Sequence, residues 1–203
     1  MPMARYSRAF LRDALRRRPI LALLAAALLS QGCAPLIVGG AAATGVMVGE
    51  DRRTVGTITE DTAIETKASS RIGDGLKGNI HVNITSYNGT VLLTGEVPDA
   101  AAKDQAARIA QGVEKVRSVY NELAVAPVTP LSVRTNDTVT TSKVKARFVD
   151  GQRFNPLHVK VVTENGVVYL LGLVNKKEAA DATEITRTTS GVNKVVRLFE
   201  YLD

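Results

Sequence analysis

Two histidines, His81 and His158, are the side chains best suited to move protons near neutral pH. The alternation of the residues around each histidine predicts a strand, with the imidazole between two apolar neighbours on the opposite face. A catalytic histidine needs a nucleophile or a carboxylate within reach, and the sequence suggests no such partner. No group of cysteines and histidines has the spacing of a metal-ligand set. We therefore expect structural histidines, no metal or cofactor, and no enzymatic activity.

The remaining reactive side chain is the only cysteine, Cys33, which cannot form a disulfide within the chain. It follows an arginine-rich start and the uncharged run Ile20–Leu29, which is shorter than the about 20 residues of a membrane-spanning helix. This arrangement is typical of a secretory signal peptide, which we predict for residues 1–32. The stretch Gln31-Gly32-Cys33 resembles the cleavage box of bacterial lipoproteins, in which the cysteine sulfur takes a diacylglyceryl group. Cys33 is therefore the predicted lipidation site and mature N-terminus.

Other interpretations of this site stay open. The box usually has leucine three residues before the cysteine, whereas Ser30 stands here, so an ordinary signal peptidase could cut the same bond. Cys33 would then be an incidental thiol or one that pairs between molecules. Ala34 in place of aspartate favours the outer membrane under the sorting rule of bacterial lipoproteins. Residues 33–60 are predicted to be a glycine- and alanine-rich tether, the alternative being an apolar segment that stays in the bilayer.

The charge distribution argues against binding to nucleic acid. The chain carries a net charge of +6, but residues 1–32 contribute +5 through six arginines and one aspartate. The body of the chain is therefore close to neutral, at +1. A protein that binds a duplex needs many side chains that neutralise phosphates, and the body shows no such concentration.

The body consists of two segments that repeat each other. The separation between matching residues is 76 at the start of the repeat, 77 in its middle and 79 near its end. The matching stretches are Asp61–Lys67 with Asp137–Lys143, His81-Val82 with His158-Val159, Asn88-Gly89 with Asn165-Gly166, and Gly112–Val116 with Gly191–Val195. Gly95 and Gly172 also correspond, and a position inside a strand favours close packing over a phosphate-binding loop.

Each repeat predicts the order helix, strand, strand, helix, strand. Asp61 is a suitable N-cap for the first helix, apolar residues then recur every four positions, and Asn88-Gly89 suits a type I′ hairpin turn. The expected elements are a helix from 61 to 76, strands at 80–85 and 90–97, a helix at 99–111 and a strand at 116–125, then a helix at 137–149, strands at 157–163 and 167–174, a helix at 176–189 and a strand at 192–202. The predicted fold class is α+β, each module having a three-stranded mixed sheet with two helices on one face. The predicted modules are 61–126 and 137–203, joined by a linker at 127–136.

Several short stretches within this framework resemble a known family. They are Arg53–Thr57, Val119–Glu122, Asn136–Thr138, Thr163–Gly166 and Leu171–Val174. Two such modules behind a lipoprotein signal resemble the dual BON-domain lipoproteins of Gram-negative envelopes (BON: bacterial OsmY and nodulation), and the resemblance covers residues 29–203. It implies a protein that is anchored in the outer membrane, faces the periplasm and supports barrier integrity. It also implies links to anionic phospholipid, to division sites and to the barrel-assembly machinery.

The resemblance assigns lipid contact to the first helix of the second module. Val139, Lys143 and Arg147 form a stripe beside the core residues of this helix, and Lys145 is a cation that the first module lacks. A representative of the family has tryptophan where Val139 stands, and valine is a weaker interfacial anchor, so Phe154 in the following loop is the candidate to replace it. Net charge is −1 over residues 61–127 and +2 over residues 137–203.

We therefore expect a non-enzymatic outer-membrane lipoprotein whose second module binds anionic phospholipid and which supports outer-membrane integrity. The competing hypothesis is an envelope adaptor that binds proteins at the division site or in the barrel-assembly machinery and does not recognise lipid. On that hypothesis, the basic residues of the helix are only a solvated face.

Overall fold

The computed structural model describes residues 51–202, all of which belong to one compact unit. The predicted signal peptide, Cys33 and most of the predicted tether lie outside these residues. Within the described range, no helix combines the length and the apolar composition needed to cross a membrane.

The first module contains two helices and one mixed sheet. Its elements are α3 (Val55–Gly75), β1 (His81–Tyr87), β2 (Thr90–Val97), α4 (Ala100–Gln111), β3 (Ser118–Asn121) and β4 (Ala124–Val125). β1 pairs antiparallel with β2, and β2 pairs in parallel with both β3 and β4. The last strand, predicted as one piece, is split after Asn121, where the Asn121 side chain accepts a hydrogen bond from the backbone N–H of Leu123 and the Leu123 side chain is buried in the core.

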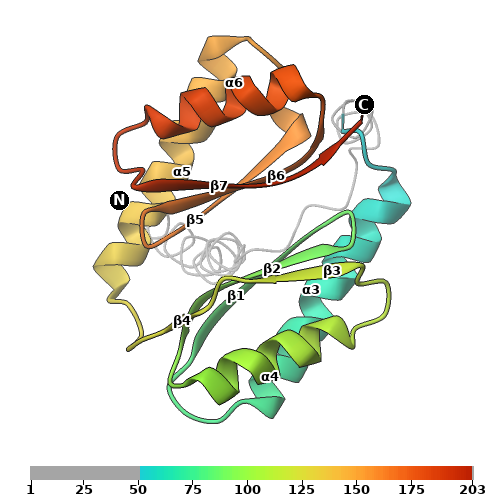
Figure 1. The fold of residues 1–203 in the computed structure, drawn as a ribbon, viewed down its shortest axis with the longest axis vertical. Helices are drawn as coiled ribbons and strands as arrows, with labels where there is room; N and C mark the ends of the chain where they lie inside the picture. Colours follow the sequence, from blue (N-terminus) through green and yellow to red (C-terminus); the bar gives the residue numbers. More distant parts are fainter. Residues whose placement is uncertain (1–50, 203) are drawn as a thin grey trace, which may run out of the picture. The chain divides into compact units, whose positions relative to one another are not determined.

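The second module repeats this topology with an unbroken last strand. Its elements are α5 (Leu131–Gly151), the short 3₁₀ helix η1 (Pro156–His158), β5 (Val159–Glu164), β6 (Val167–Val174), α6 (Lys176–Arg187) and β7 (Lys194–Tyr201). β5 and β6 are antiparallel, and β6 and β7 are parallel. Figure 1 shows α3 and α4 on one face of the first sheet and α5 and α6 on one face of the second. The predicted α+β class and module topology are confirmed.

The first helix of each module begins earlier than predicted. Asp61 is not an N-cap, because α3 starts at Val55 and the Thr54 hydroxyl accepts the capping hydrogen bond from the backbone N–H of Thr57. Likewise α5 starts at Leu131, directly after Pro130. Residues 55–60 and 131–136 are therefore helical, although they were expected in the tether and the linker.

The predicted core stripes and hairpin turns are confirmed. Ile64, Ala68 and Ile72 of α3 are buried, as are the corresponding Thr140, Val144 and Phe148 of α5. Both Asn-Gly turns have positive φ at each residue, 51° and 73° in the first module and 48° and 73° in the second, as a type I′ turn requires. Each module therefore packs an amphipathic helix over a hairpin whose register the turn fixes.

Two glycines explain how closely the hairpin strands approach. A Cβ at Gly95 would lie 2.0 Å from the carbonyl oxygen of His81, and one at Gly172 would lie 2.4 Å from that of His158. These distances leave no room for a side chain, which confirms the interpretation of both glycines as packing points.

The sheets of the two modules meet through the faces that their own helices leave uncovered. An apolar cluster joins Tyr87 and Leu92 of the first module to Tyr169 and Leu171 of the second, with the partly buried Val162, Val167, Leu173, Val196 and Leu198 packed around it. The middle strands β2 and β6 are consequently buried on both faces. The two modules therefore share one apolar interface.

We predict that Phe148→Ala lowers the free energy of unfolding by about 3–5 kcal/mol, because the ring is fully buried and its removal leaves a cavity. Urea unfolding followed by circular dichroism measures the change. Val149→Ala on the same helix is the control, because Val149 is 60% exposed and its truncation should change stability by less than about 0.5 kcal/mol. Equal effects of the two substitutions would contradict the assignment of the core face.

Candidate functional site

The outer face of α5 carries a row of small and apolar side chains that the core does not use. Helical periodicity aligns Leu131, Val139 and Val149 with Thr135, Ser142 and Ala146 along the helix. All six are exposed, and the exposed fractions are 72% for Leu131, 47% for Val139 and 60% for Val149. The same geometry places Lys143 on one side of this row and Lys145 on the other. We call these eight residues the α5 crest.

The three predicted basic residues of this helix have different surroundings. Lys145 is exposed, and Lys143 is exposed with its ammonium 3.3 Å from the hydroxyl of Ser190. Arg147 is half-buried, and its guanidinium donates to the carbonyl of Ile185 (2.9 Å) and the hydroxyl of Thr189 (2.7 Å) at the end of α6. Arg147 therefore joins two helices, and the two lysines are the cations available to a ligand.

Phe154 lies away from the crest. Its ring packs edge-to-face on Phe148 with 5.0 Å between the ring centres, and it belongs to the core cluster of the second module. This side chain anchors the loop after α5, so the structure gives no support to its predicted role as a replacement interfacial anchor.

The first module offers a comparison, because its helix α3 has the same backbone position. Lys67, which corresponds to Lys143, lies 4.0 Å from the carboxylate of Glu114. The residue that corresponds to Glu114 in the second module is Asn193, which lines a pocket with Val139 and Lys143. The equivalent pocket of the first module contains Glu60 where the second has Asn136. Two acids have thus been replaced by asparagines around Lys143.

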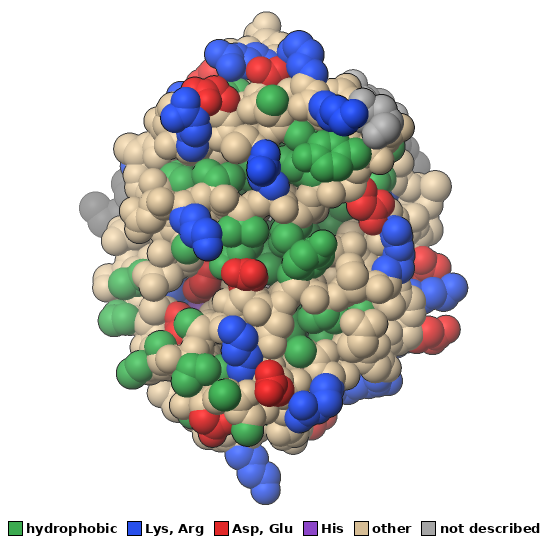
Figure 2. Space-filling model, in the orientation of Figure 1, with side chains coloured by type: hydrophobic (Ala, Val, Ile, Leu, Met, Phe, Trp, Pro, Cys, Tyr) green, Lys and Arg blue, Asp and Glu red, His purple; other side chains and the backbone are tan. Residues whose placement is uncertain are grey.

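The basic residues do not merge into a continuous patch on the face that Figure 2 draws, where lysines and arginines alternate with aspartates and glutamates. This distribution agrees with the near-neutral charge of the body. It gives no support to a nucleic-acid interface, which needs clustered cations.

A buried aspartate in each module ties the first helix to the hairpin turn. Asp61 accepts hydrogen bonds from the backbone N–H groups of Asn88 (2.8 Å) and Gly89 (2.9 Å), and also from the hydroxyl of Ser86 (2.6 Å). Asp137 accepts the corresponding bonds from Asn165 and Gly166, both 2.8 Å. The repeated Asp-Thr pair and the repeated Asn-Gly pair were visible in the sequence, but their contact across the fold was not.

Comparison with known proteins agrees with this architecture. The family model described as "BON domain" matches residues 60–127 and again residues 136–203. The chain belongs to the BON-domain family. Outer membrane lipoprotein DolP of Haemophilus influenzae is 42% identical over 184 residues, covering 89% of this chain and 94% of that protein. The 21 kDa hemolysin of Actinobacillus pleuropneumoniae is 32% identical (75% and 79% covered), and Osmotically-inducible protein Y of Escherichia coli is 33% identical (74% and 77% covered).

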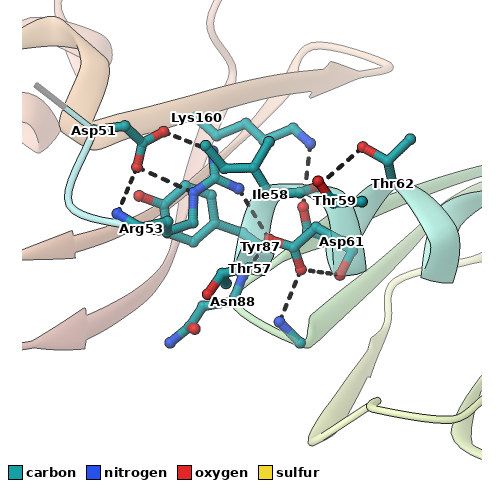
Figure 3. Close-up of polar contacts among 12 residues, drawn as sticks. Asp51, Arg53, Thr57, Ile58, Thr59, Asp61, Thr62, Tyr87, Asn88 and Lys160 are labelled. Carbon is teal, nitrogen blue, oxygen red and sulfur yellow. Dashed lines mark hydrogen bonds and ion pairs between the residues drawn. The ribbon is translucent and has the colours of Figure 1, made fainter. Parts of the chain in front are cut away.

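The segment before α3 holds the two BON modules together. Arg53 stacks over the ring of Tyr87 at 3.9 Å and donates to the carboxylates of Asp51 and Asp61, as Figure 3 shows. Burial would raise the pKa of Asp51, but the bonds from Arg53 hold it below its usual value. Arg52, the preceding residue, points to the second BON module.

Arg52 reaches Glu178 on α6 of the second BON module. Its guanidinium donates to both carboxylate oxygens, at 2.6 and 2.9 Å, and to the backbone carbonyl of Leu173 at 2.8 Å. Burial would raise the pKa of Glu178, but the bonds from Arg52, the backbone N–H of Asn175 and His158 hold it below its ordinary value of 4.5. Arg52 and Arg53, which were expected in the tether at 33–60, are therefore tied to the second and the first module.

The structure corrects the expectation that the histidines have no carboxylate partner. His81 Nδ1 lies 3.0 Å from Glu96 on the paired strand β2, and His158 Nδ1 lies 3.2 Å from Glu178. His158 also lies in η1 and not in a strand. Sequence reasoning missed both pairs because each carboxylate is brought close by the fold and not by local spacing.

We predict that Arg52→Gln destabilises the protein by about 1–3 kcal/mol at pH 7, because it leaves the buried Glu178 carboxylate without its bidentate partner. Since the folded-state pKa of Glu178 is lowered, its stabilisation is present above pH 4.5 and is lost as the pH falls through the folded-state value. The difference between the variant and the parent should therefore shrink below pH 4.5. Urea unfolding at pH 7 and pH 3.5 measures it.

The control is Arg153→Gln, because Arg153 is 52% exposed and its pair with Asp181 is longer, at 3.6 Å. This substitution should change stability by less than about 1 kcal/mol at either pH. The loss of stability in Arg52→Gln could instead be the same at pH 7 and pH 3.5. That result would show that the charge of Glu178 is not the source of the loss.

Proposed function

We propose that this BON-domain protein is a non-enzymatic outer-membrane lipoprotein, anchored through Cys33 and facing the periplasm, whose α5 crest contacts anionic phospholipid. The observation that carries the proposal is the difference between two otherwise equivalent helices. The α5 crest combines exposed Leu131, Val139 and Val149 with two lysines, Lys143 and Lys145. Among the described residues no carboxylate lies within 4 Å of either lysine, whereas Lys67 and Lys115 of the first module each have one. The name of the DolP relative supports the location.

The chemistry of the crest suits the boundary between lipid headgroups and acyl chains. Apolar side chains flanked by lysines allow the ammonium groups to reach phosphates while the row between them faces the membrane. Each basic residue near an anionic surface contributes about 1 kcal/mol, so Lys143 and Lys145 together contribute about 2 kcal/mol. A contact of this size gives a soluble fragment only weak, reversible membrane binding. It is sufficient to orient a protein that a lipid chain already holds there.

The corresponding row on α3 lacks this combination. Ala63, Thr66, Ser70 and Gly73 stand where α5 has Val139, Ser142, Ala146 and Val149, and Ser69 replaces Lys145. The acid at the C-terminal end of the row is common to both helices, as Asp74 and Asp150, so it does not contribute to the difference. In this proposal only the second module recognises lipid, and the role in outer-membrane integrity follows from its orientation on the membrane.

We predict that Lys143→Glu with Lys145→Glu weakens binding to vesicles that contain phosphatidylglycerol by at least roughly 30-fold, the equivalent of about 2 kcal/mol. Flotation of a fragment that starts at residue 50 measures the binding, with phosphatidylcholine vesicles as the reference. Binding of the parent should also fall between 0.1 and 1 M salt, where the screening length shortens from about 10 to about 3 Å. Val139→Trp should strengthen binding, because tryptophan favours the interface.

The matched control is Lys67→Glu with Lys115→Glu, which makes the same change in net charge at exposed positions of the first module. It should leave vesicle binding within about threefold of the parent. Equal losses from both pairs, or no loss from either, would favour the adaptor hypothesis, in which division-site or barrel-assembly proteins are the partners and lipid is not recognised.

The lipid anchor lies outside the described residues and is tested separately. Cys33→Ser should yield a soluble or unprocessed protein when envelopes are fractionated, because the serine hydroxyl does not replace the sulfur that carries the diacylglyceryl group. Ser30→Leu, which restores the usual cleavage box, should leave the protein with the outer membrane. Retention of Cys33→Ser in the outer membrane would place the anchor elsewhere in the chain.

A further inference from the structure

A buried cluster at the junction of the two modules joins one imidazole to two carboxylates. His81 and Glu96 face each other across β1 and β2, and Glu164 ends β5 of the other module. One ligand atom of each residue lies within 4.8 Å of the others. Glu96 is 3% exposed and Glu164 is 8% exposed. No local spacing in the sequence indicates this cluster, because its members come from three strands and two modules.

The cluster differs from the other charged contacts between the modules. Glu65 has Lys160 at 2.9 Å, Glu178 has Arg52 at 2.6 Å, and Glu200 has Arg117 at 2.8 Å. Among residues 51–202, no lysine or arginine lies within ion-pair distance of Glu96 or Glu164. Two carboxylates buried close together repel each other, and the basic group beside them among the described residues is the imidazole of His81.

The bonds around the cluster hold its oxygens in place, and one of the bonded residues, Asn83, is exposed. Asn83, which is exposed, donates from Nδ2 to Glu164 at 2.8 Å and lies 3.3 Å from His81 Nε2. Thr129, in the connector between the modules, donates to Glu96 from its backbone N–H and its hydroxyl, at 3.2 and 3.3 Å. Such outer bonds orient carboxylates in metal sites, and the exposed side at Asn83 gives an ion a path of entry.

We propose that His81, Glu96 and Glu164 bind a divalent transition-metal ion that links the two BON modules. One imidazole nitrogen and two carboxylate oxygens form a ligand set that suits Zn²⁺, with water completing a tetrahedral site. The ion supplies the positive charge that the other carboxylates at this junction receive from lysine or arginine. Its ligands come from both modules, so binding stabilises the docked pair. This inference is independent of lipid recognition by α5.

The test uses the full-length protein in detergent after treatment with a chelator. Calorimetric titration with Zn²⁺ should show saturable binding of one ion per chain, and the melting temperature should rise with Zn²⁺ concentration. Glu164→Gln and His81→Gln should each weaken binding by about tenfold or more. Asn83→Asp should strengthen it, because this exposed position would add a fourth ligand without altering the core.

The matched control is Glu200→Gln, which removes another carboxylate between the modules and should leave Zn²⁺ affinity unchanged. Every variant carries the same cysteine, so binding by a thiol cancels in the comparison. The proposal is overturned if the parent shows no saturable binding, if Glu164→Gln and Asn83→Asp both bind as the parent does, or if Glu200→Gln weakens binding as much as Glu164→Gln. Circular dichroism shows whether each variant is folded. If Glu164→Gln or His81→Gln does not fold, the Zn²⁺ affinity of Asn83→Asp decides the test.

Discussion

Burial of both faces of the middle strands is the constraint on which the rest of this structure depends. In each module one face of the sheet packs under two helices, and the other packs against the sheet of the second module through Tyr87, Leu92, Tyr169 and Leu171. A module of about 65 residues buries too little surface to be very stable alone. With few aromatic side chains in the chain, the second interface adds the apolar area that each aliphatic core lacks.

This arrangement decides which surfaces are free for function. The sheets cover each other, so the first helices α3 and α5 become the long exposed elements, and their outer faces can change without loss of the core. The shared contact from Asp61 or Asp137 to the hairpin turn keeps both helices in the same position on their sheets. A difference in charge between α3 and α5 is therefore a difference in surface chemistry on one scaffold.

Local patterns in the sequence predicted the elements and the core, and failed where the fold joins distant residues. The four-residue spacing of Ile64, Ala68 and Ile72 and the two Asn-Gly turns depend only on local geometry, so helix faces and hairpin register were predictable. The role of Asp61 was not, because its partners are 25 to 28 residues away. The alternation of Ile80, Val82 and Ile84 with polar residues predicted a strand, but it did not indicate that the polar face, which carries His81 and Asn83, meets the other module. The continuous apolar run of β6 is typical of a strand buried on both faces, and this signal could have indicated the second interface.

The candidate lipid face illustrates how a repeat separates structural from functional residues. Where both modules keep a residue, as with Asp61 and Asp137 or the two Asn-Gly turns, the contacts show a role in folding. Arg147 belongs to this group. Its guanidinium donates to the carbonyl of Ile185 near the end of α6, and the equivalent Arg71 donates to the carbonyl of Gly112 directly after α4. Val139, Lys145 and Asn193 differ from Ala63, Ser69 and Glu114 in the first module, yet none of these changes is required by packing. Since the scaffold is the same, the divergent positions around Lys143 are where selection for a ligand is expected to act.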